Sequence, residues 1–224
     1  MSEHEGEPIR GLPGHLPAGE HILWQGSPDW RVLSRTALKA HWVAIYFGGL
    51  ALWGVGSAVV AGAPILQALS SSAVTLAVGA VAVGLVVLYA FLSARTTVYT
   101  LTNKRFVLRH GVALSKCFNI PYPTIASAGL KVDANGVGDI PLGLANGYKV
   151  AYPHLWPHAR PWKIMSPEPM MVALPDAASV AELLSAQLQL VARAADKPFV
   201  AEAPRAAAAK PARDRDPSGQ PAAA

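Results

Sequence analysis

Two long stretches without charge dominate the pattern of hydrophobic and polar positions along the chain. Residues 40–63 and 73–94 are almost entirely apolar, and no Asp, Glu, Lys or Arg occurs between Ala40 and Ala94. A helix needs about 20 apolar residues to cross the hydrocarbon core of a membrane, so both stretches are long enough. Neither leaves a polar face that could point at water. The pattern predicts a transmembrane helical hairpin over residues 40–94, with an uncharged loop over residues 64–72.

Basic residues flank this hairpin on both sides, whereas the loop inside it has no charge. Three of them precede the first helix and four follow the second: Arg31, Arg35, Lys39, Arg95, Lys104, Arg105 and Arg109. Basic residues near membrane helices stay on the cytoplasmic side. We therefore expect a multi-pass membrane protein with both termini in the cytoplasm.

A short helix is predicted just before the hairpin. Ser27, Pro28 and Asp29 supply an N-cap, a first helical position and an acidic first turn. If that helix continues, Arg31, Arg35 and Lys39 fall on one face at i, i+4 and i+8. This pattern is typical of an interfacial helix on an anionic membrane surface. A solvated helix face is the alternative.

The period of the pattern changes after Thr96, where short β-branched and aromatic runs alternate with turn residues. Such runs are typical of strands, and Asn135-Gly136 is a strong hairpin signal. Several short strands at close spacing predict a small sandwich or barrel. The expected strands are 96–102, 105–110, 117–122, 125–132, 137–142, 148–152 and 170–174.

A final helix is predicted from Pro175 to about Ala195, because apolar residues recur there at helical spacing. Strands closed by one helix are the order of a pleckstrin-homology-like fold. The expected fold class is therefore α+β, with two transmembrane helices followed by a PH-like β sandwich or barrel and a C-terminal capping helix. The expected parts are a cytoplasmic N-terminal segment (1–39), the hairpin (40–94), the PH-like domain (95–195) and a disordered tail (196–224) rich in Pro, Ala and charge.

Composition narrows the classes of function. The formal net charge is +5, and beside membrane helices this favours an anionic membrane face over nucleic acid. The single cysteine, Cys117, excludes a disulfide framework. The sequence contains no paired carboxylates in a plausible cleft, no Ser–His–Asp set, no phosphate loop and no dinucleotide fingerprint. We expect a protein that is not an enzyme.

The segment from His154 to Trp162 is dense in Trp, Pro and His. His154 and His158 have metal-ligand spacing for a helix, but Pro153 and Pro157 disfavour that helix, and we expect no metal site. Trp and Arg dominate interface hot spots, so we predict that a rigid loop binds a partner protein; packing over its own domain is the alternative. The predicted contact residues are His154, Trp156, His158, Arg160 and Trp162.

Three stretches carry a family resemblance. Tyr99-Thr-Leu-Thr-Asn-Lys-Arg105 followed by Gly111 resembles bacterial PH-domain proteins. Residues 16–26, LPAGEHILWQG, and 154–162, HLWPHARPW, resemble the PuhB family of photosynthetic-complex assembly proteins of purple bacteria. The resemblance extends over about residues 12–191. It implies a noncatalytic role in assembling the reaction centre and its core light-harvesting complex, whose subunits would be the partners.

Two further hypotheses remain open. In a photosynthetic setting His41, at the start of the first membrane helix, is a candidate ligand for bacteriochlorophyll, although an interfacial anchor is the alternative. A pigment carrier is thus one rival function, and a lipid-sensing PH-like module that uses the basic residues of the interfacial helix is another. Small residues at four-residue spacing, such as Gly54 and Ala58, would allow a homodimer.

Overall fold

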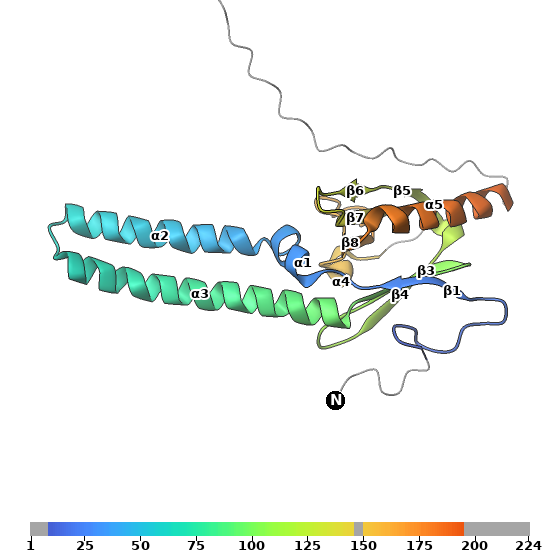
Figure 1. Ribbon diagram of the computed structural model, residues 1–224, viewed down its shortest axis with the longest axis horizontal. Coiled ribbons are helices and arrows are strands. Elements are labelled where there is room, and N and C mark those ends of the chain that lie inside the picture. Colours follow the sequence, from blue (N-terminus) through green and yellow to red (C-terminus); the bar gives the residue numbers. More distant parts are fainter. Residues whose placement is uncertain (1–8, 146–149, 195–224) are drawn as a thin grey trace, which may run out of the picture.

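The computed structural model describes residues 9–145 and 150–194, and it consists of a long helical hairpin that projects from a β-rich domain (Figure 1). The helices are α1 (Trp30–Thr36), α2 (Ala40–Val60), α3 (Ile65–Thr96), α4 (Tyr152–Leu155) and α5 (Ala177–Ala194). The strands are β1 (Ile22–Gly26), β2 (Val98–Thr102), β3 (Arg105–His110), β4 (Lys116–Pro121), β5 (Ile125–Ala128), β6 (Lys131–Val132), β7 (Gly138–Leu144) and β8 (Met170–Leu174). The predicted tail at 196–224 lies outside the described residues.

Helices α2 and α3 form the predicted hairpin, and both are long and apolar enough to cross a membrane. At 1.5 Å per residue their 21 and 32 residues extend about 32 Å and about 48 Å, against about 30 Å of hydrocarbon. In the most apolar 18-residue stretch of each helix, only 6% (α2) and 11% (α3) is buried within the protein. The core helix of a water-soluble protein would be mostly buried, so this exposed apolar surface is suited to lipid.

The predicted loop at 64–72 is wrong, because α3 begins at Ile65. The serines that suggest a loop instead donate hydrogen bonds from their hydroxyls to backbone carbonyls of the two helices. Ser70 and Ser71 donate to backbone carbonyls three residues earlier, and Ser72 donates to the carbonyl of Ala51 on α2, at 3.2 Å.

Small residues allow α2 and α3 to approach each other. A Cβ added to Gly79 would lie 2.6 Å from the Cβ of Phe47, which no real contact tolerates. Gly84, five residues further along α3, faces open space and remains exposed. The helix interface therefore runs through Gly79, and the face of α3 that carries Gly84 is free for lipid or another helix.

The β-rich domain contains two antiparallel sheets. The first has the order β1-β2-β3-β4, and in the second β7 pairs with β5, β6 and β8. The predicted strand at 125–132 divides into β5 and β6, with Gly129 and Leu130 outside both strands, although the N–H of Gly129 still donates to the carbonyl of Pro141 on β7. The predicted strand at 148–152 lies partly outside the described residues, and its last residue, Tyr152, begins α4 instead.

Helix α5 closes the domain as predicted. Val180, Leu184 and Leu188 are buried and join a single core with the inner faces of both sheets. That core includes Phe106 and Ile140, one from each sheet. Two antiparallel sheets capped by a C-terminal helix, after two long apolar helices, confirm the expected α+β class and the expected order of elements (Figure 1).

The N-terminal segment contributes more to the domain than its sequence indicates. Strand β1 pairs with β2 and forms the edge of the first sheet, opposite Tyr99–Thr102. Helix α1 begins after the N-cap Asp29, whose carboxylate accepts the N–H of Arg31 at 2.7 Å. Its Leu33 is buried in a second cluster with residues of β8 and Ala94 of α3. This segment therefore links the hairpin to the β-rich domain.

Candidate functional site where the hairpin meets the β-rich domain

The segment around α4 contacts the apolar part of α3. The ring of Trp156 stacks on Tyr89, with centroids 5.8 Å apart and planes inclined by 19°. Leu155 beside it is fully buried in the domain core, which fixes the start of this segment. Trp156 itself is half-exposed. Because Tyr89 belongs to the apolar run of α3, the segment lies against the membrane hairpin rather than on the far side of the domain.

His158 is buried completely, so its side chain is not available to the predicted partner in this structure. Its ring bridges two hydroxyls, with Nε2 3.1 Å from Thr97 Oγ1 and Nδ1 2.8 Å from Tyr99 Oη. The same tyrosine oxygen accepts the N–H of Val172 at 3.0 Å. Burial lowers the pKa of His158 well below its usual value, so the ring is neutral at pH 7. It joins the end of α3 to the start of β2 and to β8.

After His158 the chain forms a loop that returns to the domain at Met170. Its stem is held by backbone bonds, including Met170 N–H to His158 O at 2.8 Å and Arg160 N–H to Glu168 O at 2.9 Å. The Glu168 carboxylate also accepts from the side chains of Arg160 and Lys163, each at 2.9 Å. Burial alone would raise the pKa of Glu168, but hydrogen bonds from these two cations lower it. The stem is therefore charged and fixed.

The tip of this loop exposes apolar side chains. Trp162 is 94% exposed, Ile164 64% and Met165 99%. Trp162 also has a positive φ of 67°, which is uncommon for a bulky residue. Of the predicted partner-contact residues, Trp162 and His154 are exposed, Trp156 and Arg160 are partly covered and His158 is buried. Ile164 and Met165 were missed because they follow the segment that resembles a known family.

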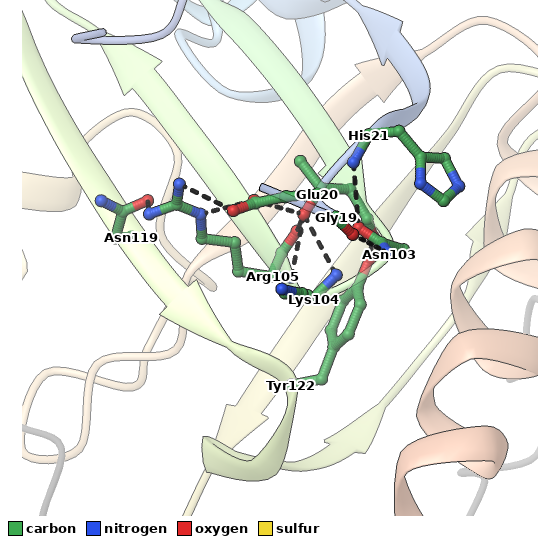
Figure 2. A network of polar contacts seen from close by, with 9 residues as sticks. Gly19, Glu20, His21, Asn103, Lys104, Arg105, Asn119 and Tyr122 are labelled. Carbon is green, nitrogen blue, oxygen red and sulfur yellow. Dashed lines mark hydrogen bonds and ion pairs between the residues drawn. The ribbon is translucent and has the colours of Figure 1, made fainter. Parts of the chain in front are cut away.

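A second polar cluster fastens the N-terminal segment to the first sheet, and sequence reasoning missed it (Figure 2). The Glu20 side chain is 2% exposed and accepts from Arg105 Nε at 2.7 Å and Nη2 at 3.1 Å. It also accepts from Thr102 Oγ1 at 2.8 Å. Asn103 completes the cluster, because its amide donates to Gly19 O and its oxygen accepts the N–H of His21. Two of the stretches that carry the family resemblance, 16–26 and 99–105, thus meet here.

The predicted membrane-surface residues do not form one helical stripe. Arg31 and Arg35 lie exposed on α1, and the guanidinium of Arg31 lies 5.4 Å from the ring centre of Trp30. Lys39 lies beyond the end of α1, with a left-handed φ of 55° at the start of α2. The predicted continuous helix is wrong because the chain must turn sharply after Thr36 to enter the hairpin. All three side chains remain exposed at the hairpin's domain end.

His41 occupies the first turn of α2, exposed, with its ring centre 5.7 Å from that of Trp42. Across residues 9–145 and 150–194, no three His, Cys, Asp or Glu side chains gather as a metal site would require.

Comparison with known proteins places these features in a family. The model of the bacterial PH domain family matches residues 48–188, from within α2 to within α5. A protein of Rhodobacter capsulatus, described as an uncharacterized 23.7 kDa protein in the puhA 5′ region, is 39% identical over 222 residues. The alignment covers 93% of this chain and 98% of that protein.

A solved structure gives a weaker likeness. It is a protein with a pleckstrin-homology domain from Shewanella loihica, which is 14% identical, covers 41% of this chain and 71% of its own, and has a TM-score of 0.27. That score is too low to support an argument about this chain.

Proposed function

The chain belongs to the bacterial PH domain family, and on that premise we propose that it is a membrane-anchored assembly factor for the photosynthetic reaction centre and its core light-harvesting complex. The relative in the puhA 5′ region supports a role connected with photosynthesis. The resemblance of residues 16–26 and 154–162 to photosynthetic-complex assembly proteins supports the finer assignment. The protein would act by contact with other proteins and without catalysis.

The observation that carries this proposal is the exposed apolar tip of the loop between His158 and Met170, which Trp162, Ile164 and Met165 form. Exposed apolar residues that stand together mark interaction sites more often than chance exposure does. Because Glu168 fixes the stem, binding would immobilise few additional groups, and preorganisation of this kind favours affinity. A partner with an apolar cytoplasmic segment near the membrane would fit this tip.

The membrane placement is part of the proposal. Helices α2 and α3 would cross the bacterial inner membrane, with both termini and the PH-like domain in the cytoplasm. Arg31, Arg35 and Lys39 would then lie at the anionic cytoplasmic surface. The assembly role needs this placement, since reaction-centre and antenna subunits are themselves membrane proteins.

An affinity pull-down from photosynthetically induced membranes tests the proposal. The tagged wild-type protein should recover partly assembled reaction-centre or antenna subunits, and Trp162→Ala should recover at least several-fold less. Leu190→Ala removes an exposed apolar side chain from α5 and should leave recovery unchanged. If both variants recover as much as the wild type, the tip is not the docking site.

An absorption spectrum of the same eluate separates the rival function. Bacteriochlorophyll without reaction-centre or antenna subunits, lost in His41→Ala, would support a pigment carrier instead. Anionic vesicles that bind the protein through Arg31, Arg35 and Lys39, without either subunit or pigment, would support a lipid-sensing module.

A further inference from the structure

Three methionines lie in the described part of the chain, and their environments differ sharply. Met165 is 99% exposed at the tip of the loop between His158 and Met170. Met170 and Met171 begin β8 and are 7% and 0% exposed. The fourth methionine, Met1, lies outside the described residues. Of the three, Met165 therefore has the side chain that is open to solvent.

A methionine thioether reacts with hydrogen peroxide without help from a catalytic group. The sulfur lone pair attacks one peroxide oxygen, the O–O bond breaks, and the proton of the transferred oxygen passes to the departing hydroxide. The products are methionine sulfoxide and one water; the sulfur loses two electrons and the peroxide gains two. Sulfoxide reductases reverse the oxidation, one enzyme for each epimer. A reversible site must therefore admit both peroxide and a reductase, and the exposure of Met165 allows both.

Oxidation of Met165 also leaves the packing of the domain intact. Met171 belongs to the core that both sheets share, and Met170 packs in the second cluster with Leu33. A sulfoxide at either position would bury a polar S–O group among apolar side chains and disrupt that packing. Met165 belongs to neither cluster, so its sulfoxide would stay in solvent on a folded protein.

The position of Met165 makes its oxidation a change in the docking surface. Trp162 and Ile164 are exposed in the same tip. Because the ion pairs of Glu168 fix the stem of the loop, the tip stays outside the domain after oxidation. An apolar partner that covers the tip would have to strip water from the sulfoxide oxygen, which costs free energy unless the partner supplies a hydrogen bond.

We propose that Met165 is a site of reversible oxidation by hydrogen peroxide, and that its sulfoxide weakens the docking of a partner protein at this tip. The unbound protein would lose affinity when peroxide accumulates and regain it on reduction. A bound partner would cover Met165 and slow its oxidation. The selectivity of oxidation follows from the exposures alone, whereas the effect on docking rests on the function proposed above.

Peptide mass spectrometry tests the selectivity. Purified full-length protein in detergent would be treated with hydrogen peroxide and sampled over time. We expect sulfoxide to form at Met165 at least tenfold faster than at Met170 or Met171, and the two sulfoxide reductases to remove it. In protein unfolded by guanidinium chloride the three rates should converge, since the contrast comes from burial. Equal rates in the folded protein would overturn the proposal.

A pull-down tests the effect on docking. Tagged protein, oxidised and then freed of peroxide, would be incubated with detergent-solubilised, photosynthetically induced membranes. It should recover at least threefold fewer reaction-centre or antenna subunits than untreated protein, and the reductases should restore recovery. Met165→Gln, which places a polar group in the tip, should show the loss without peroxide. Unchanged recovery after complete oxidation of Met165 would overturn the effect on docking.

Met165→Leu is the matched control, because it keeps an apolar side chain of similar volume but has no sulfur. After the same treatment it should recover as many subunits as untreated protein. It retains Cys117 and Trp162, which are also exposed. An equal loss in the wild type and in Met165→Leu would therefore assign the damage to other residues and contradict the proposal.

Failure of the proposed function gives a different result. If wild-type protein recovers no reaction-centre or antenna subunits even without peroxide, the assembly role fails, and the effect on docking fails with it. The peptide measurement uses purified protein and needs no partner. It therefore still decides whether Met165 is oxidised selectively and reversibly.

Discussion

The Glu20–Arg105 ion pair should hold the N-terminal segment on the sheet, and Glu20→Gln measures how strongly. The substitution preserves size but removes the charge that accepts two hydrogen bonds from Arg105 and one from Thr102. Breaking a fully buried ion pair costs about 3–5 kcal/mol, but the Arg105 side chain is 27% exposed and water can partly replace its partner. Hydrogen bonds to charged groups contribute about 1.5–3 kcal/mol, so we expect a loss of about 2 kcal/mol in the free energy of unfolding.

Thermal unfolding of the full chain in detergent, followed by tryptophan fluorescence, measures this loss. For a chain of this size 1 kcal/mol corresponds to about 2–4 °C, so the midpoint should fall by about 4–8 °C. A double-mutant cycle with Arg105→Gln isolates the pair, because each residue also has other contacts. A coupling energy below about 0.5 kcal/mol would place the pair with weak surface ion pairs and refute the reasoning.

The dependence of stability on pH in the acid range gives a second measure of the same ion pair. Burial alone would raise the pKa of Glu20, but hydrogen bonds from Arg105 and Thr102 bring it below the usual 4.5. Its contribution is therefore present above pH 4.5 and is lost as the pH falls through the lower folded-state pKa. Glu20→Gln should flatten the stability profile in that acid window and leave the profile above it unchanged in shape.

Three further predictions follow from other parts of the molecule. Leu184→Ala should lower the free energy of unfolding by about 2–5 kcal/mol, measured by denaturant unfolding, because this side chain of α5 is fully buried in the domain core; a loss below about 1 kcal/mol would contradict the packing described for α5. His158 and His110 are both buried with lowered pKa values, so stability should be complete above about pH 6.5 and fall by up to about 1.4 kcal/mol per pH unit for each group as the pH drops below it. A thermal midpoint that stays constant between pH 6.5 and 5 would refute that expectation. Gly79→Leu should lower the thermal midpoint in detergent because its side chain would collide with α2, whereas the matched Gly84→Leu should not; equal effects would mean that the helices pack elsewhere.

The sequence predicts the hairpin and most strands because their signals are local. A run of residues 40–94 without charge and alternating β-branched runs need no knowledge of distant partners. Helix α3 starts earlier than expected because three serines satisfy their hydroxyls on helix backbone, one of them on α2. Strand β1 was missed for a related reason, since its partner β2 lies more than seventy residues later.

The candidate site is less predictable because its residues take their roles from tertiary contacts. His158 and Trp162 stand four residues apart in one dense string, yet one is buried and the other is almost wholly exposed. The difference depends on Thr97 and Tyr99, which hold the His158 ring and come some sixty residues earlier. No periodicity in the string could have distinguished them.

Deletion of the gene in a purple bacterium, followed by quantification of assembled complexes in photosynthetically induced membranes, tests the assembly role most directly. The proposal predicts that reaction-centre and core antenna complexes fall severalfold while total bacteriochlorophyll synthesis continues, and that wild-type protein, but not Trp162→Ala, restores them. Unchanged complex levels in the deletion strain would contradict the proposed function.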